Sequence, residues 1–270
     1  MKENNVRKFE ECNVASDKIL HHGYHRFYPT FLEKFRNVSN FKMLELGYEN
    51  GHSIELWKNY LNNPIIHSID IIDDPNDPNL DAYFKIDQSK NELLESFYKN
   101  NNNKYQFIID DASHVPEYQW NTFVRFINLL SEGGVYIIED IETSFWGKSK
   151  FYGYEFDSQK TSIFHKLEAV YHVINNEFIP WNIQSKFKLT DLELKALIQI
   201  ETMSIAYNCL IFTKKDYLKY SKFYRNNERY RFNHEINKLQ KKKTFGLKGI
   251  LKKFILVIRK YSSKIFWKEV

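Results

Sequence analysis

The sequence has only two cysteines, Cys12 and Cys209, which lie far apart in a chain of 270 residues. Two such cysteines suggest neither a disulfide framework nor a zinc site built on thiolates, so we expect a reducing, cytoplasmic setting. The sequence also lacks an uninterrupted apolar run of about 18 residues, and a membrane-spanning helix is therefore not expected. Its first twelve residues contain no apolar stretch of the kind found in secretory signals.

Charge is distributed unevenly along the chain. The formal net charge is +5, but residues 214–270 contain 18 Lys and Arg against 4 Asp and Glu, a balance of +14, which leaves −9 for residues 1–213. This asymmetry predicts an acidic core followed by a basic extension of different character. A nucleic-acid-binding protein is not favoured, because the core is acidic and carries no RNA-binding motif.

The middle of the chain alternates short apolar runs with amphipathic stretches. We expect strands at 42–47, 65–71, 82–87, 106–111 and 135–140, and helices at 52–61, 90–99, 117–130 and 161–177. Residues 197–214 read as two strands hinged near Tyr207 and Asn208, which suits an antiparallel hairpin at a sheet edge. Strands that alternate with helices form parallel sheets with right-handed crossovers. The predicted fold is therefore α/β and Rossmann-like, with a mostly parallel seven-stranded sheet.

We expect three parts: an N-terminal helical segment at 1–40, the α/β domain at 41–214 and the basic extension at 215–270. In the extension, residues 249–267 would place apolar side chains largely on one helical face and basic ones mostly on or beside the other. Two interpretations stay open for this helix. One is peripheral binding to anionic lipid at the inner face of the cytoplasmic membrane, and the other is packing on the core or on a second subunit.

The first candidate site follows the first predicted strand. Glu45, Gly47, Gly51 and Ser53 lie in the stretch ELGYENGHS, where a strand gives way to a helix. Glycines at such a junction let backbone N–H groups approach a ligand closely. The spacing Gly-x-x-x-Gly differs from the dinucleotide pattern Gly-x-Gly-x-x-Gly, which argues against NAD. A tight turn without a ligand is the alternative.

Polar residues also follow the second and third predicted strands. Asp70 comes about 20 residues after the glycine loop, where an acid binds ribose hydroxyls in Rossmann-like sites. The alternative is that Asp70 caps the following turn. Asp87, Gln88 and Ser89 follow the third strand, in a place that suits contact with an adenine. Ser89 is also a candidate N-cap for the next helix, and the two interpretations are compatible.

Acidic residues follow the fourth and fifth predicted strands. Asp110 and Asp111 end the fourth strand, and Glu139 and Asp140 end the fifth. Adjacent parallel strands bring these side chains to one sheet edge, where ligands bind. Carboxylates gathered there repel one another unless a positive group lies among them, and oxygen ligands suit Mg²⁺ or Mn²⁺ better than zinc. Helix capping or a neighbouring lysine is the alternative.

His114 follows Asp111 by three residues and lies in the loop beyond the fourth strand. A histidine beside a metal site is suited to act as a general base, because its ordinary pKa lies near neutrality. A lone histidine is more often a surface or structural residue. The neighbouring acidic cluster favours the catalytic interpretation here.

The series LELGxxxGHS, Asp70, DQS, IIDDASH and IEDIETSFW resembles the metal-dependent sugar O-methyltransferases. That family includes the mycinamicin and tetracenomycin rhamnosyl O-methyltransferases and relatives from bacterial surface-polysaccharide clusters. The resemblance covers about residues 14–214 and extends to Ser16-Asp17-Lys18 near the N-terminus and to SIAYNCLIFTKK at the end of the domain. It departs at Ala112, where the family has Gly, and at Ser16, where Thr is usual. Neither change removes a catalytic group.

The resemblance implies a class I S-adenosylmethionine-dependent methyltransferase domain at 41–214. Asp111, Glu139 and Asp140 would bind Mg²⁺ or Mn²⁺, and His114 would be the catalytic base. The residues implied around the cofactor are Ser16, Glu45, Gly47, Gly51, Ser53, Asp70, Asp87, Gln88 and Asp110.

The expected function is methylation of a sugar hydroxyl, in surface-polysaccharide or glycoside biosynthesis. One alternative is methylation of another small diol, such as a catechol, or of a phosphorylated metabolite. An alternative of another class is a glycosyltransferase that holds Mg²⁺ and a nucleotide-sugar through acidic residues. The identity of the sugar and the oligomeric state, a homo-oligomer included, stay open.

Overall fold

A computed structural model describes residues 7–147, 152–153, 155–156, 161–175 and 183–216. The predicted basic extension at 215–270, with its amphipathic helix, lies outside the described residues apart from its first two positions. Among the described helices, none is both long enough and apolar enough to cross a membrane.

The N-terminal segment is a series of short helices packed on the domain. These are η1 (Phe9–Glu11), α1 (Asp17–Leu20), η2 (Tyr24–Arg26), α2 (Tyr28–Leu32) and η3 (Glu33–Phe35). The hydroxyl of Ser16 accepts a hydrogen bond from the backbone N–H of Lys18 and so caps α1. Phe9, Tyr24 and Tyr28 of this segment are buried against the sheet domain, so these helices contribute to the core.

The central sheet has seven strands in the order β3-β2-β1-β4-β5-β9-β8. Their bounds are β1 Lys42–Leu46, β2 Ile65–Asp70, β3 Ala82–Lys85, β4 Tyr105–Asp110, β5 Leu130–Glu139, β8 Ile200–Ala206 and β9 Cys209–Lys214. The five strands from β3 to β5 pair in parallel, and the β8–β9 hairpin joins β5 in antiparallel pairing. The predicted mostly parallel sheet with an antiparallel edge hairpin is therefore confirmed.

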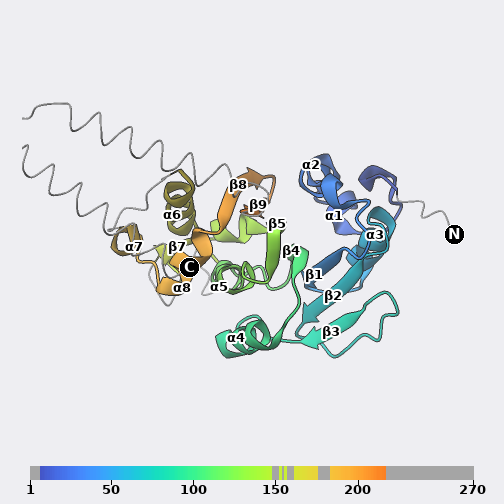
Figure 1. Ribbon diagram of the computed structural model, residues 1–270, viewed down its shortest axis with the longest axis horizontal. Coiled ribbons are helices and arrows are strands. Elements are labelled where there is room, and N and C mark those ends of the chain that lie inside the picture. The colour runs from blue at the N-terminus through green and yellow to red at the C-terminus, as the bar shows by residue number, and fades with distance from the viewer. Residues whose placement is uncertain (1–6, 148–151, 154, 157–160, 176–182, 217–270) are drawn as a thin grey trace, which may run out of the picture.

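Helices cover both faces of this sheet (Figure 1). They are α3 (His52–Tyr60), α4 (Asn91–Asn100), α5 (Pro116–Phe126), α6 (Ile163–Asn175), α7 (Ile183–Lys186) and α8 (Asp191–Leu197), with the short η4 (Ile141–Phe145) after β5 and a two-stranded ribbon of β6 (Glu155–Phe156) and β7 (Thr161–Ser162). Helix α3 and the N-terminal helices share one apolar core, while α4, α5, α6 and α8 share the core on the other face. Alternating side chains of each strand supply both cores, as in other three-layer α/β folds.

The junction between α5 and β5 differs from the prediction. Helix α5 ends at Phe126 rather than Leu130, and β5 begins at Leu130 rather than Val135. Leu130 is buried and pairs with Tyr105 of β4, whereas the next pair joins Phe107 to Val135. The intervening residues bulge out of the ladder, and Gly133 has a φ of 69° there. Pairing with β4 thus extends β5 towards the N-terminus, through residues whose sequence around Gly133 indicates a turn.

The strand order places the neighbouring strands β1 and β4 at the centre of the sheet edge that would bind a ligand. The chain moves from β1 outwards through β2 and β3, and then crosses back to β4 on the other side of β1. Such a switch point opens a crevice at the carboxyl ends of parallel strands. Asp110 pairs with Leu46 on one side and with Ile138 on the other, so the residues that follow all three strands lie at one level.

Candidate active site

A cavity of about 660 Å³ lies at this carboxyl edge. Loops after β1, β2, β3, β4 and β5 line it, together with Ala15 and Asp17 of the N-terminal segment. Eight of the residues predicted for the site line this cavity: Gly47, Ser53, Asp70, Asp87, Gln88, Asp111, His114 and Asp140. The volume is in the range of small-molecule and cofactor sites.

The other five predicted residues lie behind the lining. Ser16, Glu45, Asp110 and Glu139 are buried, and Gly51 is the N-cap of α3, with a φ of 72°. The structure therefore places them in supporting positions around the cavity rather than on its surface.

The glycine loop needs its first glycine for close packing as well as for its backbone angle. Gly47 has a φ of 92°, and a Cβ at this position would lie 2.1 Å from the carbonyl oxygen of Asp111. No side chain fits there without separating the loop after β1 from the loop after β4. The two loops that bound the cavity are thus held in direct backbone contact.

Asp70 anchors the glycine loop to the end of β2. Its Oδ2 accepts a hydrogen bond of 2.7 Å from the backbone N–H of Tyr48, and its Oδ1 accepts one of 2.6 Å from Ile71. The carboxylate also lines the cavity. Asp70 therefore caps the following turn, as one interpretation predicts, while its contact with a ribose stays a prediction that its position in the cavity lining allows.

Gln88 joins the loop after β3 to the loop after β4. Its Nε2 donates a hydrogen bond of 2.7 Å to Asp110, and its Oε1 accepts one of 2.5 Å from the hydroxyl of Ser113. Burial raises the pKa of Asp110 to about 7. The interpretation of Ser89 as an N-cap is wrong, since Lys90 occupies that position without a side-chain hydrogen bond.

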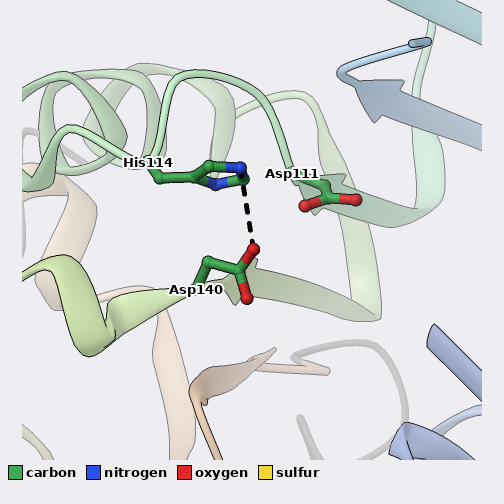
Figure 2. A group of neighbouring side chains, drawn as sticks. All are labelled: Asp111, His114 and Asp140. Atoms are coloured by element: carbon green, nitrogen blue, oxygen red, sulfur yellow. Dashed lines mark ion pairs between the residues drawn. The ribbon is translucent and has the colours of Figure 1, made fainter. Parts of the chain in front are cut away.

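Asp111, His114 and Asp140 form a cluster at the cavity. One potential ligand atom from each lies within 4.8 Å of the others, and His114 Nε2 is 3.6 Å from Asp140 Oδ2. Figure 2 shows the imidazole of His114, on the loop after β4, pointing towards the carboxylate of Asp140 at the end of β5. All three side chains are half-buried and line the cavity. The positive φ angles of His114 and Asp140, 54° and 53°, turn the chain sharply at both positions.

Glu139 faces a different partner. Nζ of Lys18 lies 2.7 Å from Glu139 Oε2 and 2.5 Å from Asp111 Oδ2, and the lysine side chain is fully buried. The hydroxyl of Tyr28 donates a hydrogen bond to the other carboxylate oxygen of Glu139. Glu45 Oε1 lies 3.8 Å from the same ammonium group. The acidic cluster therefore contains a neighbouring lysine, Lys18, as one interpretation of the sequence predicts.

Burial and charge compete among these groups. Burial opposes the charged form of Lys18, but Asp111, Glu139 and Glu45 together raise its pKa well above the ordinary lysine value. Burial raises the pKa of Glu45 to about 7, against the effect of Lys18. Burial and then the charge of Asp111 also raise the pKa of Glu139. The cluster therefore needs a cation to hold its carboxylates in the ionised form.

Sequence reasoning missed several residues that orient the acids. Asp140 Oδ1 accepts hydrogen bonds from the hydroxyl of Tyr24 and from Asn208 Nδ2, at 3.2 and 2.7 Å. The ring of Tyr24 stacks on those of His22 and Tyr28. The dense cluster of His and Tyr after Lys18 is the sequence feature that indicates these residues. Its spacing does not show which residues of the sheet the side chains contact.

The residues present fit both groups that the family resemblance implies. Asp111 and Asp140 offer the oxygen donors that Mg²⁺ prefers, and Lys18 already stands among the carboxylates as a positive charge. The cavity has room for a nucleoside-sized group beside backbone that only glycine can provide at position 47.

No family model matches the sequence. Curated relatives include the 8-demethyl-8-α-L-rhamnosyl tetracenomycin-C 2′-O-methyltransferase from Streptomyces olivaceus, 28% identical over 160 residues, which are 55% of this chain and 40% of that protein. Mycinamicin VI 2″-O-methyltransferase from Micromonospora griseorubida is 28% identical over 132 residues, or 45% of this chain and 33% of that protein. The chain thus spans less than half the length of these relatives.

Among solved structures, the MycE methyltransferase of the mycinamycin pathway, described in complex with Mg and SAH, superimposes with a TM-score of 0.64. It is 19% identical in sequence, and the match covers 79% of this chain and 55% of that one. This likeness establishes the fold. The chain therefore has the class I methyltransferase fold, and the resemblance to sugar O-methyltransferases read from its motifs is confirmed by curated relatives that bear such names.

Proposed function

We propose that the chain is an S-adenosylmethionine-dependent, Mg²⁺-dependent O-methyltransferase that acts on a sugar hydroxyl in glycoside or surface-polysaccharide biosynthesis. The observation that carries this proposal is the position of Asp111, His114 and Asp140, which together face a cofactor-sized cavity at the switch point of the sheet. Relatives named as sugar O-methyltransferases support the choice of acceptor.

Contacts in the structure support the proposed residue roles. Asp111 and Asp140 would hold the divalent cation, with Glu139 supporting them from behind, where it binds Lys18 and Tyr28. When bound, S-adenosylmethionine supplies the electrophilic methyl group, and Mg²⁺ lowers the pKa of the acceptor hydroxyl. Asp70 and the backbone around Gly47 would orient the cofactor, since both line the cavity.

His114 would take the proton from the acceptor hydroxyl. Its Nε2 lies 3.6 Å from Asp140 Oδ2, so the carboxylate would favour the positive charge that the ring gains on taking the proton. The side chain is about one-third exposed, with a relative exposure of 32%, so a substrate in the cavity can reach it. The supporting hydrogen bond from the hydroxyl of Thr143 to the carbonyl oxygen of His114, 2.7 Å long, fixes the backbone at this point.

The first experiment separates a methyltransferase from a metal-dependent glycosyltransferase. Thermal unfolding would be followed with S-adenosylhomocysteine, UDP and GDP, each with Mg²⁺. We expect stabilisation by S-adenosylhomocysteine alone, because a ligand that binds the native state raises its melting temperature. Stabilisation by a nucleoside diphosphate, without any by S-adenosylhomocysteine, would refute the proposal.

The second experiment identifies the acceptor class. Transfer of a labelled methyl group would be measured with rhamnosides, sugar nucleotides and catechols, in Mg²⁺ and after removal of metal by EDTA. We expect labelled sugar, no turnover in EDTA and recovery on addition of Mg²⁺. Labelled catechol without labelled sugar would contradict the sugar acceptor and indicate another diol as the substrate. Full activity in EDTA would contradict the metal dependence.

The basic sequence at 215–270 is proposed to bind anionic membrane surfaces peripherally. The support is its charge balance, since each basic residue near an anionic surface adds about 1 kcal/mol. The test is co-sedimentation of the full chain with neutral and anionic liposomes, compared with a variant in which Lys241, Lys242 and Lys243 are changed to Glu. Equal sedimentation of the two proteins with anionic liposomes would refute this role.

A further inference from the structure

Lys18 is an unusual residue for the interior of a protein. Its side chain is fully buried, and it comes from the first turn of a helix of only four residues, far from the sheet edge in sequence. Its ammonium group lies 2.5 Å from Asp111 Oδ2 and 2.7 Å from Glu139 Oε2. A buried lysine is costly unless carboxylates compensate its charge, so these contacts fix the side chain in place.

Two cation positions meet at Asp111. The inner position, between Asp111 and Glu139, holds the ammonium group of Lys18. The outer position, between Asp111, His114 and Asp140, faces the cavity. Because both positions draw on the carboxylate of Asp111, a positive charge in one weakens binding of a second positive charge in the other.

We propose that Lys18 is a built-in counter-ion, which keeps the carboxylates of Asp111 and Glu139 assembled before a divalent cation binds and competes with that cation for Asp111. The inference rests on the proposed metal dependence and adds to it a residue that tunes metal affinity. Lys18 acts as a positioning residue, through the two carboxylates rather than through the substrate.

The N-terminal segment is built to hold Lys18 at this point. The hydroxyl of Ser16 caps the helix at the backbone N–H of Lys18 itself. Downstream, the stacked rings of Tyr24 and Tyr28 direct their hydroxyl groups to Asp140 and Glu139. The same segment thus places the ammonium group and two phenol hydroxyl groups at the acidic edge. The charge of the site therefore depends on how the N-terminal helices pack.

The test compares the full chain with the variant Lys18→Met, which keeps the length and apolar stem of the side chain but removes its charge. Melting temperatures would be measured in EDTA and in increasing MnCl₂, and free Mn²⁺ would be measured by electron paramagnetic resonance. We expect Lys18→Met to melt at a lower temperature in EDTA, since its buried carboxylates lack a counter-ion. We expect Mn²⁺ to bind this variant about tenfold more tightly or better, because one positive charge near Asp111 is gone.

Lys166→Met is the matched control. Lys166 is also fully buried and lies 2.7 Å from the carboxylate of Glu193, but this ion pair joins α6 to α8 away from the acidic edge. Its loss destabilises the protein without touching Asp111. We therefore expect Lys166→Met to melt at a lower temperature in EDTA, with an affinity for Mn²⁺ equal to that of the unchanged chain.

The outcomes separate the inference from the proposal beneath it. Mn²⁺ affinity in Lys18→Met that equals or falls below that of the unchanged chain overturns the competition, and an equal gain in Lys166→Met shows a general effect of destabilisation. If Lys18→Met folds only in the presence of Mn²⁺, the counter-ion role is supported. A lack of Mn²⁺ binding by the unchanged chain and both variants overturns the inference together with the metal dependence, whereas S-adenosylhomocysteine binding still tests the methyltransferase separately.

Discussion

Asn208 donates a hydrogen bond of 2.7 Å from its Nδ2 to Oδ1 of Asp140. Asn208 sits in the turn between β8 and β9, and its own Oδ1 accepts a hydrogen bond from the backbone N–H of Glu142. Because Glu139 pairs with Cys209, the hairpin turn lies directly beside the end of β5. The edge hairpin therefore orients a proposed metal ligand, in addition to closing the sheet.

The variant Asn208→Gly tests this role. Glycine tolerates the φ of 53° at this position, so the change removes the hydrogen bonds of the side chain without straining the turn. We expect metal affinity or kcat to fall about 10- to 100-fold, as for other residues that orient metal ligands. Asn63→Gly, at a φ of 48° in the turn after α3, is the control and should leave both unchanged. Equal values for the two variants would contradict the orienting role.

His114→Asn tests the proposed base. Asparagine tolerates the φ of 54° at this position but has no group that takes up a proton near neutral pH. We expect kcat to fall about 10²- to 10⁴-fold, while the affinity for S-adenosylhomocysteine in calorimetry stays near that of the unchanged chain. His52→Asn, which alters another histidine lining the cavity, serves as the control. A collapse of S-adenosylhomocysteine binding in His114→Asn would place His114 in the cofactor site instead.

Gly47→Ala tests the contact between the two loops. The added Cβ would lie 2.1 Å from the carbonyl oxygen of Asp111, which is backbone and cannot rotate away. We expect a lower melting temperature and S-adenosylhomocysteine binding weakened by about tenfold or more, because the loops must separate. Gly147→Ala is the control, since among the described residues, its chain neighbours aside, no atom lies within 4 Å of a Cβ at that position. Normal binding by Gly47→Ala would show that the loops can part without cost.

The buried pair of Lys166 and Glu193 predicts a dependence of stability on pH. Burial acts to raise the pKa of Glu193. The hydrogen bonds that its carboxylate accepts from Lys166, from the backbone N–H of Thr190 and from Trp120 nevertheless hold this pKa below its ordinary value of 4.5. The ionised Glu193 therefore stabilises the fold above pH 4.5, and this contribution is lost as the pH falls through the lowered pKa. We expect Glu193→Gln to cost about 3 kcal/mol at pH 7.

Urea unfolding at pH 7 and at several values below pH 4.5 measures this difference. The difference in the free energy of unfolding between Glu193→Gln and the unchanged chain should become smaller as the pH falls, since Glu193 is then neutral in both the folded and the unfolded chain. Glu168→Gln, which removes an exposed partner of Lys186, should change stability by less than about 1 kcal/mol at every pH. A gap that is constant with pH would show that the charge of Glu193 does not contribute.

Much of the fold can be predicted from the sequence because its strands are short, apolar and regularly spaced. The expected positions of β1, β2 and β4 agree with the structure to within about one residue, and the hairpin at 197–214 is present. The start of β5 could not be predicted, because Leu130 joins the sheet through pairing with Tyr105, whereas the local sequence around Gly133 indicates a turn. Contacts with a neighbouring strand decide that boundary.

The part of the candidate site that lies at strand ends could be predicted from the sequence. Asp111 and Asp140 follow adjacent strands, so the α/β pattern alone brings them to one edge. Lys18 could not be placed in this way, since it lies 93 residues before Asp111 and reaches it through packing of the N-terminal helices. Glu139 ends β5 and Asp140 follows it, and the direction of each side chain decides which of the two lines the cavity. Only Asp140 does so.

The irregular pairing at the start of β5 has a consequence for how this chain can vary in length. Tyr105 meets Leu130 and Phe107 meets Val135, so the residues between Leu130 and Val135 take no part in the regular ladder. We expect an insertion or deletion in this stretch to change the size of the bulge and to leave the pair of Phe107 with Val135 intact. The regular pairing from Phe107 and Val135 to Asp110 and Ile138 lies beyond the bulge, so we expect the acidic edge to keep its register when the first part of β5 changes in length.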